Sequence, residues 1–454
     1  MDEHTQLSGH TVAGKERPER LLPSALKAIA GKARAEPEHR FGGLYSLLNK
    51  SNLRAAYHEL NPKAKPGVDK VDYAEYGRDL EDNTSWLVEQ LKGKRYHAKL
   101  IRRVHIPKGP NTTRPLGILC MSDKVAQRVA SRILEAIYEQ DFLDFSYAYR
   151  PHRDTRNAIR KLRDGLMESR CQWIVELDIK GYYDSIDHDT LIGFIEKRVS
   201  DRTFVRLIRK WLNAGVLQND GMVEHPATGT PQGGIVSCVL ANIYLHHVVD
   251  KWFAEEFKPS CQGEAILVRY ADDITAAFQS REDADRFYRM VEDRMRGFGL
   301  TLSKDKCGIK FFSRNAKRES ERFDFLGFEF RWGRSRKGWN KIKLRTSRKK
   351  LRKSISSFTE WIRQHRNRSA RWVIQKVNEK LRGYYNYYGV TDNYGSLKSL
   401  FSAIRGLIFK WLNRRSDRKS YTIKSFCQML KGHLLERPKI IWQVYLPQQE
   451  MQLV

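Results

Sequence analysis

The sequence has few cysteines, and none of them is paired at the spacing of a metal-binding or redox motif. Only six occur in 454 residues. They are Cys120, Cys171, Cys238, Cys261, Cys307 and Cys427. The absence of a Cys-x-x-Cys pair argues against both a zinc site and a disulfide framework, and it fits a reducing compartment. We therefore expect a cytoplasmic protein.

Long apolar runs are also missing. The chain begins Met-Asp-Glu-His without an apolar segment, so we expect no signal peptide. The longest apolar stretch, around residues 234–245, is too short and too polar to cross a bilayer. These absences predict a soluble protein with no membrane partner.

Acidic residues are scarce relative to basic ones, and the imbalance is local. Lys and Arg number 83 against 53 Asp and Glu, a net charge of +30. Residues 331–454 hold 30 basic and 6 acidic residues, a net of +24, whereas residues 1–330 hold 53 and 47, a net of +6. Clustered cations favour a phosphate backbone, because neutralising phosphates releases counterions. RNA or DNA is the expected partner, and an anionic membrane surface is the alternative.

Hydrophobic periodicity predicts a helical front, an α+β middle and a basic helical end. Residues 1–38 show no sustained period and are predicted to form a flexible N-terminal leader, with one short helix near residues 21–30. Helical spacing dominates residues 41–91. A strand is predicted over residues 100–107, and a long helix over residues 123–140.

The middle of the chain contains three apolar strand patterns that bring acidic residues together. Residues 172–178 alternate as a buried strand that ends at Asp178. Residues 265–270 and 274–278 are two apolar runs separated by Ala-Asp-Asp. This arrangement predicts a β-hairpin with an acidic pair at its tip.

Beyond residue 331 two apolar stripes at helical spacing predict packed helices. The first stripe contains Leu344, Leu351, Ile355, Phe358 and Ile362, and the second contains Val373, Val377, Leu381, Tyr384 and Tyr388. Residues 331–370 hold fifteen basic residues and one acidic residue, more than solubility requires. The opposite faces are therefore predicted to bind nucleic acid. The residues predicted for this role are Arg345, Arg348, Lys349, Lys350, Arg352 and Lys353.

The acidic pair at the hairpin tip suggests a metal-dependent reaction. Adjacent carboxylates repel each other unless a cation lies beside them. Asp178, Asp272 and Asp273 together would supply the oxygen ligands that Mg²⁺ prefers. Two such ions about 3.5–4 Å apart activate an attacking hydroxyl and stabilise the leaving oxygen. Taken alone, an Asp-Asp turn is more often a solvated hairpin tip, so the neighbouring motifs decide between these interpretations.

Five motifs resemble, in order, those of the reverse transcriptases encoded by bacterial group II introns. They are residues 114–118 (RPLGI, fingers), 177–184 (LDIKGYYD, third metal-binding Asp), 229–234 (GTPQGG) followed by 241–245 (ANIYL, nucleotide pocket), 268–273 (VRYADD, catalytic hairpin) and 325–328 (FLGF, primer side). The resemblance covers roughly residues 40–450. It implies an α+β right-hand polymerase that transfers nucleotides from dNTPs onto a DNA primer along an RNA template.

The resemblance also implies roles for single residues. Asp178, Asp272 and Asp273 are expected to ligate two Mg²⁺ ions, for which Mn²⁺ is a possible substitute, and the carbonyl of Ile179 is a further ligand.

Five more residues are expected to contact the incoming nucleotide. Lys108 and Arg114 are expected to grip its triphosphate, because the planar fork of Arg suits phosphate oxygens. Tyr183 takes the position of an aromatic gate against a 2′-hydroxyl, and Gln232 that of a residue at the sugar or the templating base pair. Lys306 is expected to protonate the pyrophosphate leaving group, although a solvated basic turn would also explain it.

The predicted domain order follows from the same resemblance. After the leader, fingers and palm occupy residues 39–335, a basic helical thumb 336–412, and a basic DNA-binding tail 413–454. The thumb segment 381–385 (LRGYY) resembles the maturase region that holds intron RNA for splicing. Expected partners are thus an RNA template, structured intron RNA, a DNA primer and target DNA.

Departures from the family pattern are few. Cys238 and Leu119 stand where Pro is usual, and neither removes a catalytic group. No Cys-rich or His-rich endonuclease segment follows residue 420, so an endonuclease-lacking form is expected. The Gln-Gly-Gly at residues 232–234 argues against diversity-generating retroelement enzymes. Two alternatives stay open: an RNA-binding splicing factor with incidental polymerase activity, and a domesticated reverse transcriptase in DNA repair or phage defence.

Overall fold

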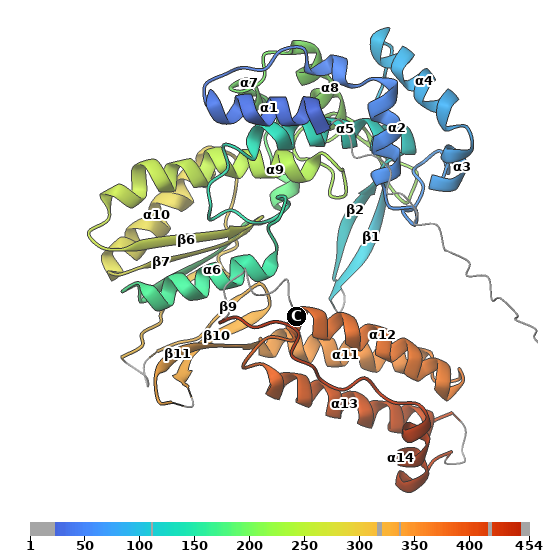
Figure 1. Cartoon of the computed structure of the whole chain (residues 1–454), viewed down its shortest axis with the longest axis vertical. Helices are drawn as coiled ribbons and strands as arrows, with labels where there is room; N and C mark the ends of the chain where they lie inside the picture. Colours follow the sequence, from blue (N-terminus) through green and yellow to red (C-terminus); the bar gives the residue numbers. More distant parts are fainter. Residues whose placement is uncertain (1–22, 110–111, 316–319, 336, 416–419, 446–454) are drawn as a thin grey trace, which may run out of the picture. The chain divides into compact units, whose positions relative to one another are not determined.

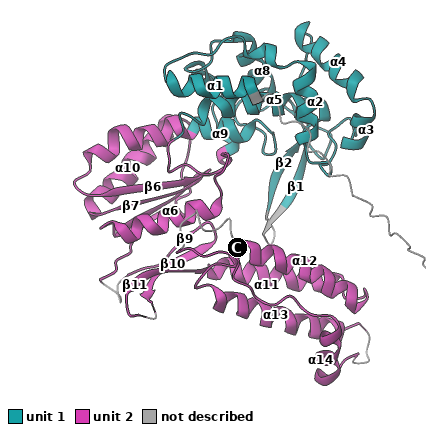
Figure 2. Ribbon diagram, viewed as in Figure 1, with its two compact units in different colours: residues 1–107, 113–142, 183–244 teal, residues 108–112, 143–182, 245–454 magenta. Residues whose placement is uncertain are grey.

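The computed structural model describes residues 23–109, 112–315, 320–335, 337–415 and 420–445. Its chain forms two compact units, coloured separately in Figure 2. Unit 1 comprises residues 1–107, 113–142 and 183–244, and unit 2 comprises residues 108–112, 143–182 and 245–454.

Unit 1 is mainly helical and is built around α5 (Met121–Tyr138), which is buried along most of its length. The surrounding helices are α1 (Pro23–Ala35), α2 (Lys50–Glu59), α3 (Tyr73–Arg78), α4 (Leu80–Lys92), α7 (His188–Glu196), α8 (Arg202–Leu212) and α9 (Ser237–Leu245). A small sheet with the strand order β2-β1-β4-β5 contains β1 (Ile101–Gly109), β2 (Thr112–Ile118), β4 (Val216–Leu217) and β5 (Val223–Glu224). The helix and strand expected near residues 123–140 and 100–107 are confirmed.

The structure differs from the predicted flexible leader in its second half. Helix α1 packs against α5, and Ala33 is buried. The guanidinium of Arg198 donates hydrogen bonds to the carbonyls of Ala33, Glu36 and His39. Residues 23–38 therefore belong to the folded unit, whereas residues 1–22 lie outside the described part of the chain.

Unit 2 contains a four-stranded antiparallel sheet with the order β6-β7-β3-β8. Its strands are β3 (Trp173–Asp178), β6 (Ala265–Tyr270), β7 (Asp273–Phe278) and β8 (Gly308–Phe311). Helix α6 (Thr155–Glu168) packs against β6, and α10 (Arg281–Gly297) packs against β3 and β7. Figure 1 shows these two helices on either side of the sheet. The predicted strand and hairpin are confirmed.

A second antiparallel sheet in unit 2 has the order β11-β10-β9. It consists of β9 (Phe323–Phe325), β10 (Phe328–Arg334) and β11 (Asn340–Thr346). Its apolar residues join those of α6 in one core. Leu344, which was predicted to begin a helical stripe, lies instead in β11 and in this core, because β11 pairs with β10 along its whole length.

The basic end of the chain is helical as predicted. It contains α11 (Arg348–Gln364), α12 (Ala370–Tyr388), α13 (Tyr394–Leu412) and α14 (Ile423–Gly432). Phe358 and Ile362 from the first stripe, and Val373, Val377 and Leu381 from the second, meet in a separate core. Within the described residues, no helix combines the length and the apolar character needed to cross a membrane.

The predicted C-terminal tail is folded into unit 2 over its described residues. Phe426 and Leu435 enter the helical core around α12 and α13, whereas Trp442 and Val444 enter the core beside α6. A parallel bridge joins Val390 to Trp442. Residues 420–445 therefore connect both cores of this unit.

Candidate active site

The two adjacent aspartates lie at a tight turn between β6 and β7. Tyr270 pairs with Asp273, so Ala271 and Asp272 form a two-residue hairpin loop. Ala271 has a φ of 56°, which is uncommon for a residue with a side chain. Such backbone strain occurs preferentially at functional sites, where the surrounding structure maintains it. We call residues 270–273 the catalytic turn.

The third predicted carboxylate lies directly opposite this turn. Asp178, the last residue of β3, pairs with Asp273, the first residue of β7. Residues paired in this way project from the same face of a sheet, with their Cβ atoms about 4.5–5.5 Å apart. The sheet register thus brings together two acids almost a hundred positions apart in the sequence.

The electrostatics of the site show an excess of negative charge. Desolvation by the surrounding protein raises the pKa of Asp273 to about 6, and the charges of Asp272 and Asp178 add to this shift. Asp273 is nevertheless exposed, so neighbouring protein atoms surround its carboxyl without excluding solvent from it. Lys350 and Lys306 oppose the shift. A cation bound here would relieve the remaining repulsion.

This pKa shift predicts that ionisation of Asp273 lowers the free energy of unfolding of the metal-free protein. The folded pKa is raised from the ordinary 3.8 to about 6, so folding disfavours the ionised form. Stability should therefore fall as the pH rises through this interval. Asp273→Asn should raise the free energy of unfolding near pH 7, by less than about 1 kcal/mol because solvent screens the exposed carboxyl. Chemical denaturation in EDTA at pH 4 and pH 7 measures the difference, and an equal effect at both values would contradict the assignment.

Lys306 is next to the carboxylates. Its Nζ lies 2.6 Å from Oδ2 of Asp178. The hydrogen bond to Asp178, with the charges of the three aspartates, raises the pKa of Lys306. This lysine therefore stays protonated at neutral pH, as a proton donor at this position must be. Its neighbour Lys304 lies 3.7 Å from Glu292 instead.

The carbonyl of Ile179, the expected backbone ligand, follows β3 directly after Asp178. An antiparallel bridge pairs Ile179 with Leu302 through N–H groups of Lys180 and Ser303, so the bridge does not use the Ile179 carbonyl. Among the residues that the structure describes, no three Asp, Glu, His or Cys side chains converge closely enough to hold a metal ion. The site offers oxygen donors, which fit Mg²⁺, with the Asp178 carboxylate turned towards Lys306.

Three of the predicted nucleotide-binding residues lie on adjoining segments of unit 1. The N–H of Gly117, in the strand that carries Arg114, donates to the carbonyl of Gln232 over 2.6 Å. The N–H of Thr230 donates to the carbonyl of Tyr183 over 2.7 Å. The loop that contains Gln232 therefore joins the other two segments.

Glycine is required where these segments meet. Gly233 has a φ of 110°, and an added Cβ would lie 2.5 Å from the carbonyl oxygen of Gly117. Gly229 has a φ of 94°, and a Cβ there would lie 2.9 Å from Cα of Asp184. Both positions need a left-handed backbone and a close approach that only glycine permits. Lys108 lies in β1, and its side chain is outside the described part of the structure.

The predicted nucleic-acid-binding residues divide into two groups. Arg348, Lys349, Lys350, Arg352 and Lys353 are exposed on α11, as predicted. Arg345 is not on a helix: it lies in β11, and its Nη2 is 2.7 Å from Oε1 of Glu329. The prediction of Arg345 on a solvated helix face is therefore wrong, because pairing with β10 places it opposite Glu329.

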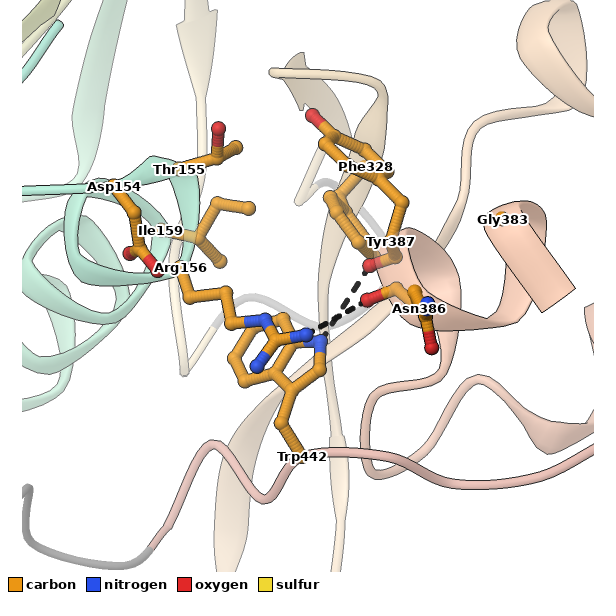
Figure 3. Close-up of a pocket in the computed structure, with 9 residues that line it drawn as sticks. All are labelled: Asp154, Thr155, Arg156, Ile159, Phe328, Gly383, Asn386, Tyr387 and Trp442. Atoms are coloured by element: carbon orange, nitrogen blue, oxygen red, sulfur yellow. Dashed lines mark hydrogen bonds between the residues drawn. The ribbon is translucent and has the colours of Figure 1, made fainter. Parts of the chain in front are cut away.

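A feature that the sequence did not reveal is a pocket of about 370 Å³ beside the catalytic turn (Figure 3). Its lining residues are Asp154, Thr155, Arg156, Ile159, Phe328, Gly383, Asn386, Tyr387 and Trp442. Thr155 donates a hydrogen bond of 3.2 Å to the hydroxyl of Tyr270. Tyr387 donates one of 2.8 Å to the carbonyl of Leu326, in the primer-side motif. Only the tertiary structure reveals this set, since its members come from four separate segments.

Two family models match the chain. Residues 106–330 match the model described as reverse transcriptase (RNA-dependent DNA polymerase). Residues 348–428 match the model described as group II intron, maturase-specific domain. The first match contains all three aspartates, and the second contains α11, α12 and α13.

Individual relatives agree with these matches. The group II intron-encoded protein LtrA of Lactococcus lactis subsp. cremoris is 29% identical over 434 residues, covering 74% of this chain and 70% of its own. The protein YkfC of Escherichia coli strain K12 is 28% identical over 376 residues, covering 75% of this chain and 96% of its own. An uncharacterized 91 kDa protein in the cob intron of Schizosaccharomyces pombe is 36% identical over 230 residues, 49% of this chain and 27% of its own.

The polymerase match, the adjoining maturase match and the relatives identify both parts of the molecule. The mixed helices and antiparallel sheets agree with the α+β polymerase fold expected from the motifs. The chain therefore belongs to the group II intron-encoded reverse transcriptases, and it is an RNA-directed DNA polymerase joined to a maturase domain.

Proposed function

We propose that Asp178, Asp272 and Asp273 hold two Mg²⁺ ions and catalyse the addition of dNTPs to a DNA primer on an RNA template. The observation that carries this proposal is the pairing of Asp178 with Asp273 at the strained catalytic turn, within the reverse transcriptase match. The bound ions would activate the primer hydroxyl and stabilise the departing pyrophosphate. The carbonyl of Ile179 is a further ligand in this proposal, and Mn²⁺ is an alternative ion. Primer extension by an Asp272 variant tests it, as set out in the Discussion.

Lys306 fits the role of proton donor to the leaving group. It lies within hydrogen-bond reach of Asp178 and carries a raised pKa. Lys108 and Arg114 bind the triphosphate in this proposal, and Gln232 contacts the sugar or the templating pair. Arg114 is exposed on β2, which leaves its guanidinium open to a ligand.

Tyr183 is proposed as the gate against ribonucleotides. Its backbone carbonyl accepts a hydrogen bond from the N–H of Thr230, two residues before Gln232, which supports a place beside that segment. Tyr183→Ala should increase ribonucleotide incorporation relative to deoxynucleotide incorporation by about tenfold or more, the scale on which pockets discriminate small substituents. Single-nucleotide extension with matched rNTP and dNTP measures the ratio.

The control for this test is Tyr183→Phe, which keeps the ring and removes only the hydroxyl. It should retain the wild-type preference for dNTPs. An unchanged ratio in Tyr183→Ala would remove Tyr183 as the gate and leave it a packing residue.

We also propose that the thumb, residues 336–412, binds structured intron RNA and assists its splicing. The support is the maturase-specific match together with five exposed cations on α11. LtrA, by its name, is encoded by a group II intron, which makes an intron RNA the first partner to test. The segment from residue 413 onward is proposed to contact target DNA.

A further inference from the structure

A fully buried ion pair lies beneath the catalytic turn. Arg269 and Asp250 are both inaccessible to solvent, and the two ends of the guanidinium fork meet the two carboxylate oxygens. The Nε–Oδ1 distance is 2.7 Å. Burying such a pair costs a large desolvation energy, and apolar residues of similar volume often stabilise a fold equally well. Stability alone therefore does not account for this pair.

Arg269 connects the pair to the backbone that carries the aspartates. Its Nη1 donates to the carbonyl of Ala271 over 3.3 Å. Its Nη2 also donates to Oγ of Ser146 over 2.7 Å. The Ala271 carbonyl belongs to the peptide that links Ala271 to Asp272. Rotation of that peptide would swing Asp272 away from its present position, and the φ of 56° at Ala271 means that the turn needs external support.

The partner carboxylate is held by an unusual helix. Asp250 is the last residue of a π-helical turn, His246–Asp250. Such turns insert one extra residue, are rare, and occur frequently at functional sites. On its other side, the backbone of Arg269 is fixed by Phe145 and Tyr147, with N–O distances of 2.8 and 2.9 Å. Two separate segments, residues 145–147 and the turn that ends at Asp250, thus fix this one arginine.

We propose that Arg269 is a positioning residue, which, oriented by Asp250, holds the catalytic turn in the geometry needed for metal binding and nucleotide transfer. This inference rests on the proposed function of the three aspartates. This role requires the guanidinium group of arginine, because the single ammonium group of a lysine cannot reach Asp250, Ser146 and Ala271 together.

The test is Arg269→Lys in the full chain. We expect kcat for single-nucleotide extension to fall about 10- to 100-fold, the effect of a misplacement near 1 Å, with the KM for dNTP and the RNA affinity unchanged. Mn²⁺ binding by the free protein, followed by electron paramagnetic resonance, should weaken as well. A control is Arg198→Lys in the ion pair of the buried Arg198 with the partly buried Asp141, which should leave both readouts unchanged.

The outcomes are distinct. A folded Arg269→Lys protein with wild-type kcat and Mn²⁺ affinity overturns the proposal. If that variant does not fold, Asp250→Asn replaces it, because the amide keeps the size and one acceptor oxygen, and the same two readouts decide. If wild-type protein binds Mn²⁺ but extends no primer, the proposed function fails, whereas weaker Mn²⁺ binding by Arg269→Lys still supports the positioning role.

Discussion

Asp272→Asn is expected to abolish extension of a DNA primer on an RNA template. The carboxylate lies in the catalytic turn, beside Asp273 and across from Asp178. An amide keeps the shape but removes the charge that binds a divalent cation. Losing several kcal/mol of metal-dependent stabilisation of the transition state corresponds to at least about a thousandfold loss in rate. RNA affinity should stay close to that of the wild type, because α11 carries the exposed cations.

Asp305→Asn provides the matched control for that variant. Asp305 is exposed one position before Lys306, so the same change in charge and size occurs next to the site without touching a proposed ligand. It should extend primers at nearly the wild-type rate. Extension by Asp272→Asn at the rate of this control would show that Asp272 is not a metal ligand.

Replacing Arg348, Lys349, Arg352 and Lys353 together with Gln is expected to weaken RNA binding at least about tenfold at low salt. The slope of log affinity against log salt should become shallower by up to about 3–4, because each lost phosphate contact releases about one counterion fewer. All four side chains are exposed on α11, so the fold should survive. Lys350 is left unchanged because it acts electrostatically on Asp273.

The control removes the same charge from unit 1. Lys27, Lys63, Lys70 and Lys92 are exposed there, and their replacement with Gln should cost much less affinity. Equal losses in the two variants would show that binding follows net charge rather than the thumb.

A splicing assay separates the two proposed roles. With an intron RNA from the flanking DNA, the α11 variant should lose splicing. It should also extend primers more slowly, because a thumb holds the primer–template duplex as well. Asp272→Asn should keep splicing, because holding RNA needs no catalytic metal. Loss of splicing in Asp272→Asn together with its retention in the α11 variant would contradict this division.

The sequence sufficed to predict the elements that carry the three aspartates. Strand β3 alternates towards its end at Asp178, whereas β6 and β7 are short apolar runs separated by Ala-Asp-Asp, which marks the turn between them. Short apolar runs bounded by turn residues favour strands, and here the tertiary structure agrees with the local pattern. The pairing of Asp178 with Asp273 was implied only by family resemblance, since sheet register depends on long-range contacts.

Features set by distant partners could not be predicted. Arg345 follows helical spacing in the sequence, yet pairing of β11 with β10 places it in a strand opposite Glu329. Ala33 is buried in part because Arg198, far along the chain, binds its carbonyl. The sequence also does not reveal the buried pair of Arg269 and Asp250, because the burial of a charged residue depends on a partner that only the folded chain brings to it.

We expect this chain to copy RNA into DNA at the catalytic turn. The direct measurement is single-turnover addition of one complementary dNTP to a DNA primer annealed to RNA, with Mg²⁺ and purified wild-type protein. We expect templated addition that EDTA stops and that excess Mg²⁺ restores. Tight binding of the primer–template with no addition in either Mg²⁺ or Mn²⁺ would contradict it.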